Sequence, residues 1–148
     1  MSIESRYGWH DLRLAMEAWP ERICEARRQG NWRRDERDFF LCFFVQCWSL
    51  VDWAAKSGAI PYRELSFAWR SRQSMLLCKD IANRYKHLTL DREIFDKNWS
   101  VWLDHDQSPP LYFVTAKGHN FPLWELMVDC ISFWEEAAAA FHLDAKRP

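Results

Sequence analysis

The stretch FFLCFFVQCWSLVDWAA, residues Phe39–Ala55, is the most apolar part of the chain. Its large side chains recur at three- and four-residue spacing, which predicts a helix over about Arg34–Lys56. Because the stretch is apolar almost all round, we expect this helix to lie at the centre of the fold. Gln46 and Asp52 interrupt the apolar stretch Phe39–Ala55, which is too short to cross a bilayer, so we expect a core helix.

The composition predicts a single domain over residues 1–148 with a core built from large rings. Aromatic residues make up 16% of the chain, with 10 Trp and 10 Phe. The four glycines argue against a β-sandwich or a glycine-rich nucleotide loop. With 20 Lys and Arg against 21 Asp and Glu, the overall charge does not indicate a nucleic-acid binder, although it leaves room for a local basic patch.

Amphipathic spacing predicts further helices over Gly8–Gln29, Tyr62–Ser71 and Gln73–Thr89. Pro20 lies inside the first of these segments, where it either kinks the helix or begins a second one, because proline lacks an N–H and clashes with the preceding turn.

A last helix is predicted to begin with Asn120 as its N-cap and Pro122 in its first turn. Its apolar residues step by four and three positions, which is typical of a bundle helix or of the seam of a coiled dimer. They are Leu123, Met127, Cys130, Trp134, Ala137 and Phe141.

Two short runs before the last helix, Trp99–Leu103 and Leu111–Thr115, are rich in β-branched and aromatic residues and predict a β-hairpin. A lone hairpin is marginally stable, so we expect it to pack on the helices or on a second copy of the chain. The fold prediction is therefore all-α: an antiparallel bundle of four to five helices with a small inserted β-hairpin before the last helix. In the hairpin loop, His105 could hold a metal, but a solvated loop residue is the favoured interpretation.

The five cysteines form no CxxC pair, and each lies in an apolar helical run. They are Cys24, Cys42, Cys47, Cys78 and Cys130. Such a pattern is typical of buried, reduced thiols in a cytosolic protein, and a zinc site would need closer pairs. We therefore expect no metal and no cofactor. The polar start, Met1–Arg13, has no signal-peptide pattern, so a cytoplasmic location and no membrane partner are expected.

Six arginines lie from Arg22 to Arg37, and the acidic residues among and beside them are Glu21, Glu25, Asp35 and Glu36. One hypothesis is a phosphate-contacting stripe with Trp32 as a stacking ring. The favoured interpretation is a solvated turn between two helices, held by salt bridges, because acidic residues interrupt the basic run.

The stretch Cys78–Leu88 gathers the polar groups that could carry chemistry. At about 100° of rotation per residue, Asp80, Asn83, Arg84 and His87 share one helical face beside an apolar one, at the boundary between core and solvent. Asp52, on the central helix, starts on apolar surface. It is expected either to find a partner in a groove facing these groups or to reach solvent near the helix end.

These residue types are sufficient for cleavage of RNA without a metal. His87 can take the proton from a ribose 2′-OH as general base, and Arg84 and Lys86 can stabilise the charge on the phosphate. Asn83 would hold the substrate, and Asp80 or Asp52 would orient it. The sequence contains no serine elbow, Walker loop, GxGxxG or HExxH motif, which argues against several large enzyme classes.

Two segments carry a family resemblance. The chain resembles bacterial proteins of the HEPN superfamily in the segment Phe39–Trp53 and in the later segment Asp80–His87. Those proteins also carry a hairpin before a last, Trp-containing helix. The resemblance covers roughly residues 39–140. It implies a small helical homodimer that binds RNA or acts as a metal-independent ribonuclease of a toxin or phage-defence system.

The family motif places Arg four to six residues before His, whereas Arg84 lies three residues before His87. If the family spacing is required, Lys86 or Arg84 has to supply the cation. The alternative function is a non-catalytic dimeric module that binds a protein partner, with Asp80 and Arg84 as an ion pair along the helix. A weaker alternative is a metal site that combines His87 with Asp52 or Asp80.

Overall fold

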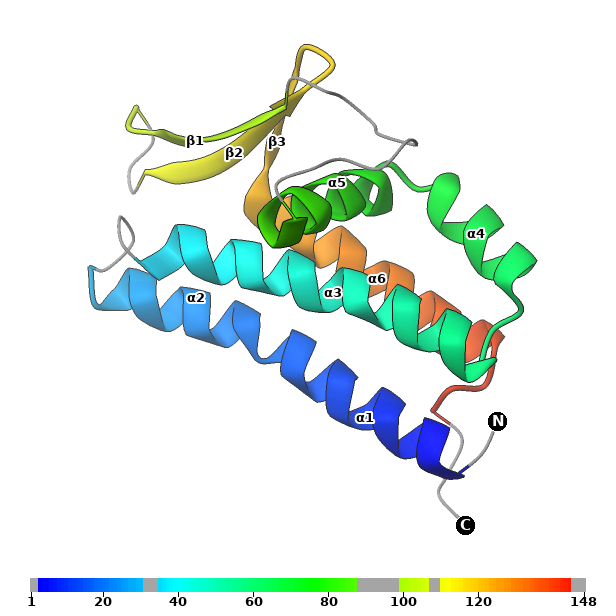
Figure 1. Ribbon diagram of the computed structural model, residues 1–148. Coiled ribbons are helices and arrows are strands. Elements are labelled where there is room, and N and C mark those ends of the chain that lie inside the picture. Colours follow the sequence, from blue (N-terminus) through cyan, green and yellow to red (C-terminus); the bar gives the residue numbers. More distant parts are fainter. Residues whose placement is uncertain (1–2, 31–34, 88–98, 107–109, 145–148) are drawn as a thin grey trace.

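A computed structural model describes residues 3–30, 35–87, 99–106 and 110–144. Residues 3–7 and 86–87 are described as helical backbone only. The described chain is mainly helical, with a small antiparallel sheet before the last helix (Figure 1). The elements are α1 (Ile3–Glu17), α2 (Trp19–Arg28), α3 (Arg37–Ser57), α4 (Tyr62–Arg70), α5 (Gln73–His87), β1 (Ser100–Asp104), β2 (Leu111–Ala116), β3 (His119–Pro122) and α6 (Leu123–Ala140).

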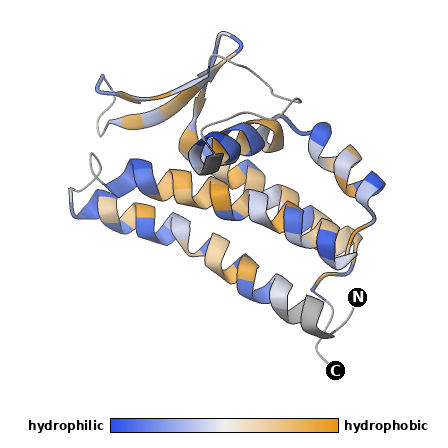
Figure 2. Cartoon of the chain, viewed as in Figure 1, coloured by the Kyte–Doolittle hydropathy of each residue, from blue (hydrophilic) through white to orange (hydrophobic). Residues whose placement is uncertain are grey.

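Helix α3 lies at the centre, as predicted, in contact with all five other helices. Phe43, Phe44 and Leu50 are completely buried, and apolar residues run along α3 and α6 in Figure 2. The helix ends at Ser57 and is capped by Gly58, whose φ of 71° is the left-handed conformation that favours glycine.

The predicted bounds of this helix are close to the observed ones, since α3 begins at Arg37 and ends at Ser57. The run Phe39–Ala55 was predicted to be too short to cross a bilayer, but the whole helix is longer. At 21 residues α3 is long and apolar enough to cross a membrane by length and composition alone, while half of its most apolar window is buried inside the fold.

The first predicted helix is two helices, and Pro20 lies in the first turn of the second one. Both pack against α3. Trp9 of α1 is fully buried between Trp53 and Trp134, with ring centres 5.8 and 5.7 Å away. Gly8 allows this close packing, because a Cβ atom there would lie 2.9 Å from the Trp53 ring nitrogen.

The sheet contains the predicted hairpin, β1 and β2, and a third strand that was not predicted. Figure 1 shows it at one end of the molecule, away from both termini. Alternate residues of β2, Tyr112, Val114 and Ala116, are buried, and β2 and β3 contact α6. The hairpin was expected to pack on the helices or on a second copy of the chain, and in the structure the sheet packs on a helix, α6.

The predicted start of the last helix is wrong by two residues, because its N-cap is Pro122 and not Asn120. Asn120 pairs with Thr115 across β2 and β3 rather than capping a helix, and α6 begins at Leu123, after Pro122. The reason is the turn between the strands. Lys117 and Gly118 both have positive φ, 51° and 73°, which is the two-residue turn that closes a tight hairpin.

Candidate functional site

The polar face of α5 lies deeper than the sequence suggested. Asp80 is 1% exposed and Asn83 is 8% exposed, so both belong to the interior and not to the boundary with solvent. Lys79 is also buried, and its ammonium lies 5.6 Å from the centre of the Trp69 ring of α4. These side chains can position α5, but they do not form an open surface for a large substrate.

Arg84 is held by the residue that leads into the sheet. Its guanidinium lies 4.2 Å from the centre of the Trp99 ring, and its Nη1 donates a hydrogen bond of 3.3 Å to the Trp99 carbonyl oxygen. Trp99 itself is buried. A cation stacked on a desolvated ring and bonded to a carbonyl is firmly placed, so this pair ties the last turns of α5 to the start of β1.

The remaining predicted site residues fall into two groups. Lys86 and His87 lie in the last turn of α5, and their side chains fall outside the described residues, so their roles stay predictions. Asp52 is exposed on α3, as the solvent interpretation expects. The structure therefore brings Asp80, Asn83 and Arg84 together on α5, but it does not place Asp52 among the buried groups.

The arginine-rich turn contains ion pairs, as the favoured interpretation predicted, but one of these pairs is buried and not solvated as expected. Arg28 pairs with Glu25 at 2.8 Å on the surface, and Arg27 pairs with Glu36, whose side chain is only 2% exposed. Burial raises the pKa of Glu36, and the hydrogen bond and charge of Arg27 oppose that rise without cancelling it. Trp32 lies outside the described residues. His105 is exposed in its loop, as expected.

The Arg27–Glu36 pair lines a cavity of about 350 Å³ between α2, α3, β2 and the start of α6. Its other walls are largely apolar and include Phe40, Tyr112 and Trp124. Burial also raises the pKa of Tyr112, and the nearby charge of Glu36 adds to that rise. No sequence pattern indicates this cavity, because its walls come from four separate segments.

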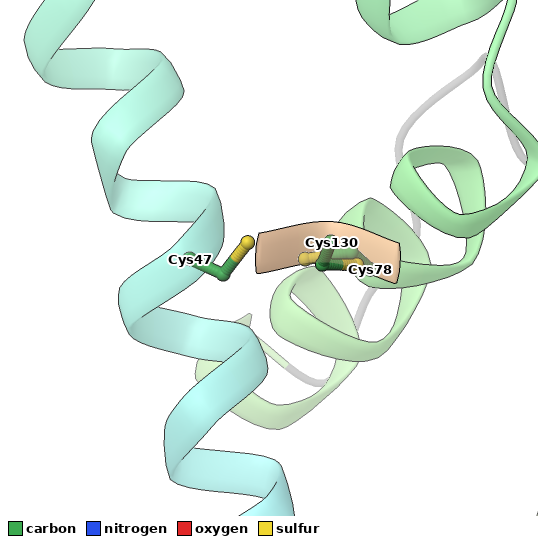
Figure 3. A group of neighbouring side chains, drawn as sticks. All are labelled: Cys47, Cys78 and Cys130. Atoms are coloured by element: carbon green, nitrogen blue, oxygen red, sulfur yellow. The ribbon is translucent and has the colours of Figure 1, made fainter. Parts of the chain in front are cut away.

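Three cysteines meet in the core, which the sequence analysis missed. The sulfur atoms of Cys47, Cys78 and Cys130 all lie within 4.8 Å of one another, and all three residues are completely buried. Figure 3 shows one side chain from each of α3, α5 and α6. Burial was predicted for each of these cysteines, but their meeting depends on where the helices cross. All five cysteines are free thiols, and Cys24 and Cys42 are only partly buried, contrary to prediction.

The three thiols differ in acidity. Burial opposes ionisation of Cys47, but the interactions of its sulfur with Cys130, Cys78 and the Trp134 indole outweigh burial and lower the pKa of Cys47 to about 5. Burial and the neighbouring sulfurs raise the pKa of Cys78 and of Cys130 well above the ordinary value.

No family model, curated protein or solved structure matches the chain. The likeness to the HEPN superfamily therefore stays a prediction.

Proposed function

We propose that this chain is a cytoplasmic HEPN-like RNA-binding protein that cleaves RNA without a metal, as a homodimer with an antiparallel helical-bundle fold. The observation that supports the proposal best is the anchoring of Arg84 on Trp99, which holds the last turns of α5 in place. General acid–base catalysis needs groups held within hydrogen-bond reach of the substrate, and a fixed helix end supplies such a position.

The proposal gives the residues of α5 two kinds of role. His87 is the general base, and Lys86 and Arg84 supply the positive charge that stabilises the phosphate in the transition state. Asp80 and Asn83 are buried, so in the proposal they position the helix rather than touch RNA. Asp52, which is exposed on α3, remains a candidate for substrate contact.

The test is cleavage of a labelled RNA by the purified protein in EDTA. We expect cleavage by the wild-type chain and a loss of about a hundredfold or more in His87→Ala, because a positioned base contributes on that scale. His105→Ala is the matched control, since His105 is an exposed loop histidine, and its rate should not change. RNA that stays intact with the wild-type chain overturns the ribonuclease, and RNA that is not retained in a filter-binding assay overturns RNA binding.

A second candidate function is the non-catalytic dimeric module, favoured by one face of α6. Trp124 and Val128, one turn apart, are 39% and 46% exposed, and they line a shallow groove with Glu125, Asp129 and Ser132. Apolar side chains at this spacing are what a helix-to-helix interface presents. In this candidate the groove is covered by α6 of a second copy of the chain.

Sedimentation of two variants tests the module. Val128→Glu should convert a dimer into a monomer, whereas Leu14→Glu, which changes an exposed leucine on α1, should leave the dimer intact. A wild-type monomer at micromolar concentration would contradict the module. A dimer that survives His87→Ala, together with absent RNA cleavage, would favour it over the ribonuclease.

A further inference from the structure

The three core cysteines have the arrangement of a ligand set. They come from three different helices, and their sulfur atoms converge within 4.8 Å of one another (Figure 3). With metal–sulfur bonds of about 2.3 Å, three sulfurs around one ion in a plane are about 4.0 Å apart. Closing the cluster around an ion therefore needs sulfur movements of less than about 1 Å, which side-chain rotation can supply.

The ligand number indicates which ions fit. Structural zinc is almost always four-coordinate. Among the described residues, no fourth Cys, His, Asp or Glu joins the three sulfurs. Cys47, Cys78 and Cys130 are completely buried, so the fold leaves no exposed face where bulk water could serve as the fourth ligand. Thiolates select soft ions, and among the soft ions Cu(I) does not require four ligands.

The cluster also has polar neighbours. The Sγ atoms of Cys78 and Cys130 each lie 3.5 Å from a backbone carbonyl oxygen, that of Phe44 and that of Ser74, to which the thiols donate. The indole N–H of Trp134 is buried and has no acceptor in ordinary hydrogen-bond geometry among the described residues, so it is available to the sulfur of Cys47.

We propose that Cys47, Cys78 and Cys130 form a binding site for a soft metal ion of low coordination number, of the Cu(I) class. The ion links α3, α5 and α6 at the centre of the fold. Because all three residues are inaccessible in the folded chain, the ion enters while the helices assemble or open, and not by diffusion to a surface site.

The test is an anaerobic Cu(I) titration of the full chain during refolding, in competition with a coloured Cu(I) chelator. We expect one Cu(I) per chain, bound at least tenfold more weakly in Cys47→Ser. Cys42→Ser is the matched control, because Cys42 lies on the same helix but outside the cluster, and it should bind like the wild-type chain. Circular dichroism checks that each variant folds.

X-ray absorption of the loaded wild-type chain gives a second readout that needs no variant. Two or three sulfur neighbours and no nitrogen or oxygen neighbour support the site. A wild-type chain that takes up no Cu(I), a spectrum with nitrogen or oxygen ligands, or equal uptake by Cys47→Ser overturns it. Tight binding of one Zn(II) per chain with weak binding of Cu(I), measured in a parallel titration, overturns the assignment to a low-coordinate ion.

Discussion

The indole nitrogen of Trp9 donates a hydrogen bond of 2.9 Å to the carboxylate of Asp144, a residue 135 positions further along the chain. Arg13, one turn after Trp9, also donates to this carboxylate. The three residues join α1 to the segment that follows α6. Burial alone would raise the pKa of Asp144, but the hydrogen bonds from Arg13 and Trp9 outweigh burial and lower it.

Replacing Asp144 with Ala should lower the free energy of unfolding by about 1 kcal/mol at pH 7, a modest value because the pair is partly exposed to solvent. The folded-state pKa of Asp144 lies below its unfolded value of 3.8, so this contribution is present above 3.8 and is lost as the pH falls through the folded pKa. Urea unfolding at pH 7 and pH 2.5 measures both values. If Asp144→Ala lowers the free energy of unfolding by the same amount at both pH values, the lowered pKa of Asp144 is contradicted.

The buried pair of Arg27 and Glu36 predicts a larger effect. Arg27→Met leaves the Glu36 carboxylate buried without its partner, which should cost about 3 kcal/mol at pH 7. Arg28→Met is the control, because Arg28 pairs with Glu25 on the surface and its loss should cost at most about 0.5 kcal/mol. Thermal or urea unfolding measures the loss of stability in each variant. Equal losses in Arg27→Met and Arg28→Met would show that burial does not strengthen the Arg27–Glu36 pair.

Glu36 also predicts a pH dependence of the opposite sign to that of Asp144. The folded-state pKa of Glu36 lies above the unfolded value of 4.5. Between these two pKa values the folded chain therefore binds more protons than the unfolded chain. Stability linked to Glu36 is present below 4.5 and is lost as the pH rises through the folded pKa. Glu36→Gln should remove this loss, and the wild-type and variant curves of unfolding free energy against pH should diverge above 4.5. Parallel curves would contradict the shift.

The contact of Arg84 with Trp99 is best measured as a coupling. In a double-mutant cycle of Arg84→Ala and Trp99→Leu, we expect a coupling energy of about 1 kcal/mol, because a cation stacked on a buried ring contributes on that scale. Urea unfolding of the four chains supplies the values. Additive effects would show that the ring and the guanidinium do not act together.

At Gly8 we expect the effect of an alanine substitution to be opposite to what helix propensity predicts. Alanine is ordinarily favoured over glycine inside a helix by about 1 kcal/mol. At Gly8 the added Cβ would meet the Trp53 ring nitrogen at 2.9 Å, so Gly8→Ala should be destabilising. In a Trp53→Phe background the ring is smaller, and the same substitution should be less harmful or stabilising. A stabilised Gly8→Ala chain with Trp53 intact would show that the ring moves away at little cost.

Periodicity predicted the elements whose burial follows one helical face. Leu123, Met127, Cys130, Trp134 and Ala137 are all buried in α6, as their spacing required. Phe141, the last residue of the predicted series, follows α6 as its C-cap and is only half-buried. The spacing in α5 likewise showed which residues share a face. It did not show how deep that face lies, because Asp80 and Asn83 are buried by neighbouring elements and not by their own helix.

The features that were missed depend on contacts between distant segments. Strand β3 has four residues, too few for an alternating pattern, and its Asn and Pro are the same cues that predict a helix start. The cluster of Cys47, Cys78 and Cys130 has no motif in the sequence, since its spacings of dozens of residues become contacts only when three helices cross.

The central position of α3 has a consequence for synthesis on the ribosome. Helix α6 is the last described element to be made, and it covers part of α3, α5 and the sheet. Until α6 emerges, the nascent chain carries a 21-residue apolar helix without its final cover. Exposed apolar surface of this kind favours association between unfinished chains. We expect a chain truncated before Leu123 to accumulate bound to chaperones or in aggregates, whereas the full-length chain remains dispersed.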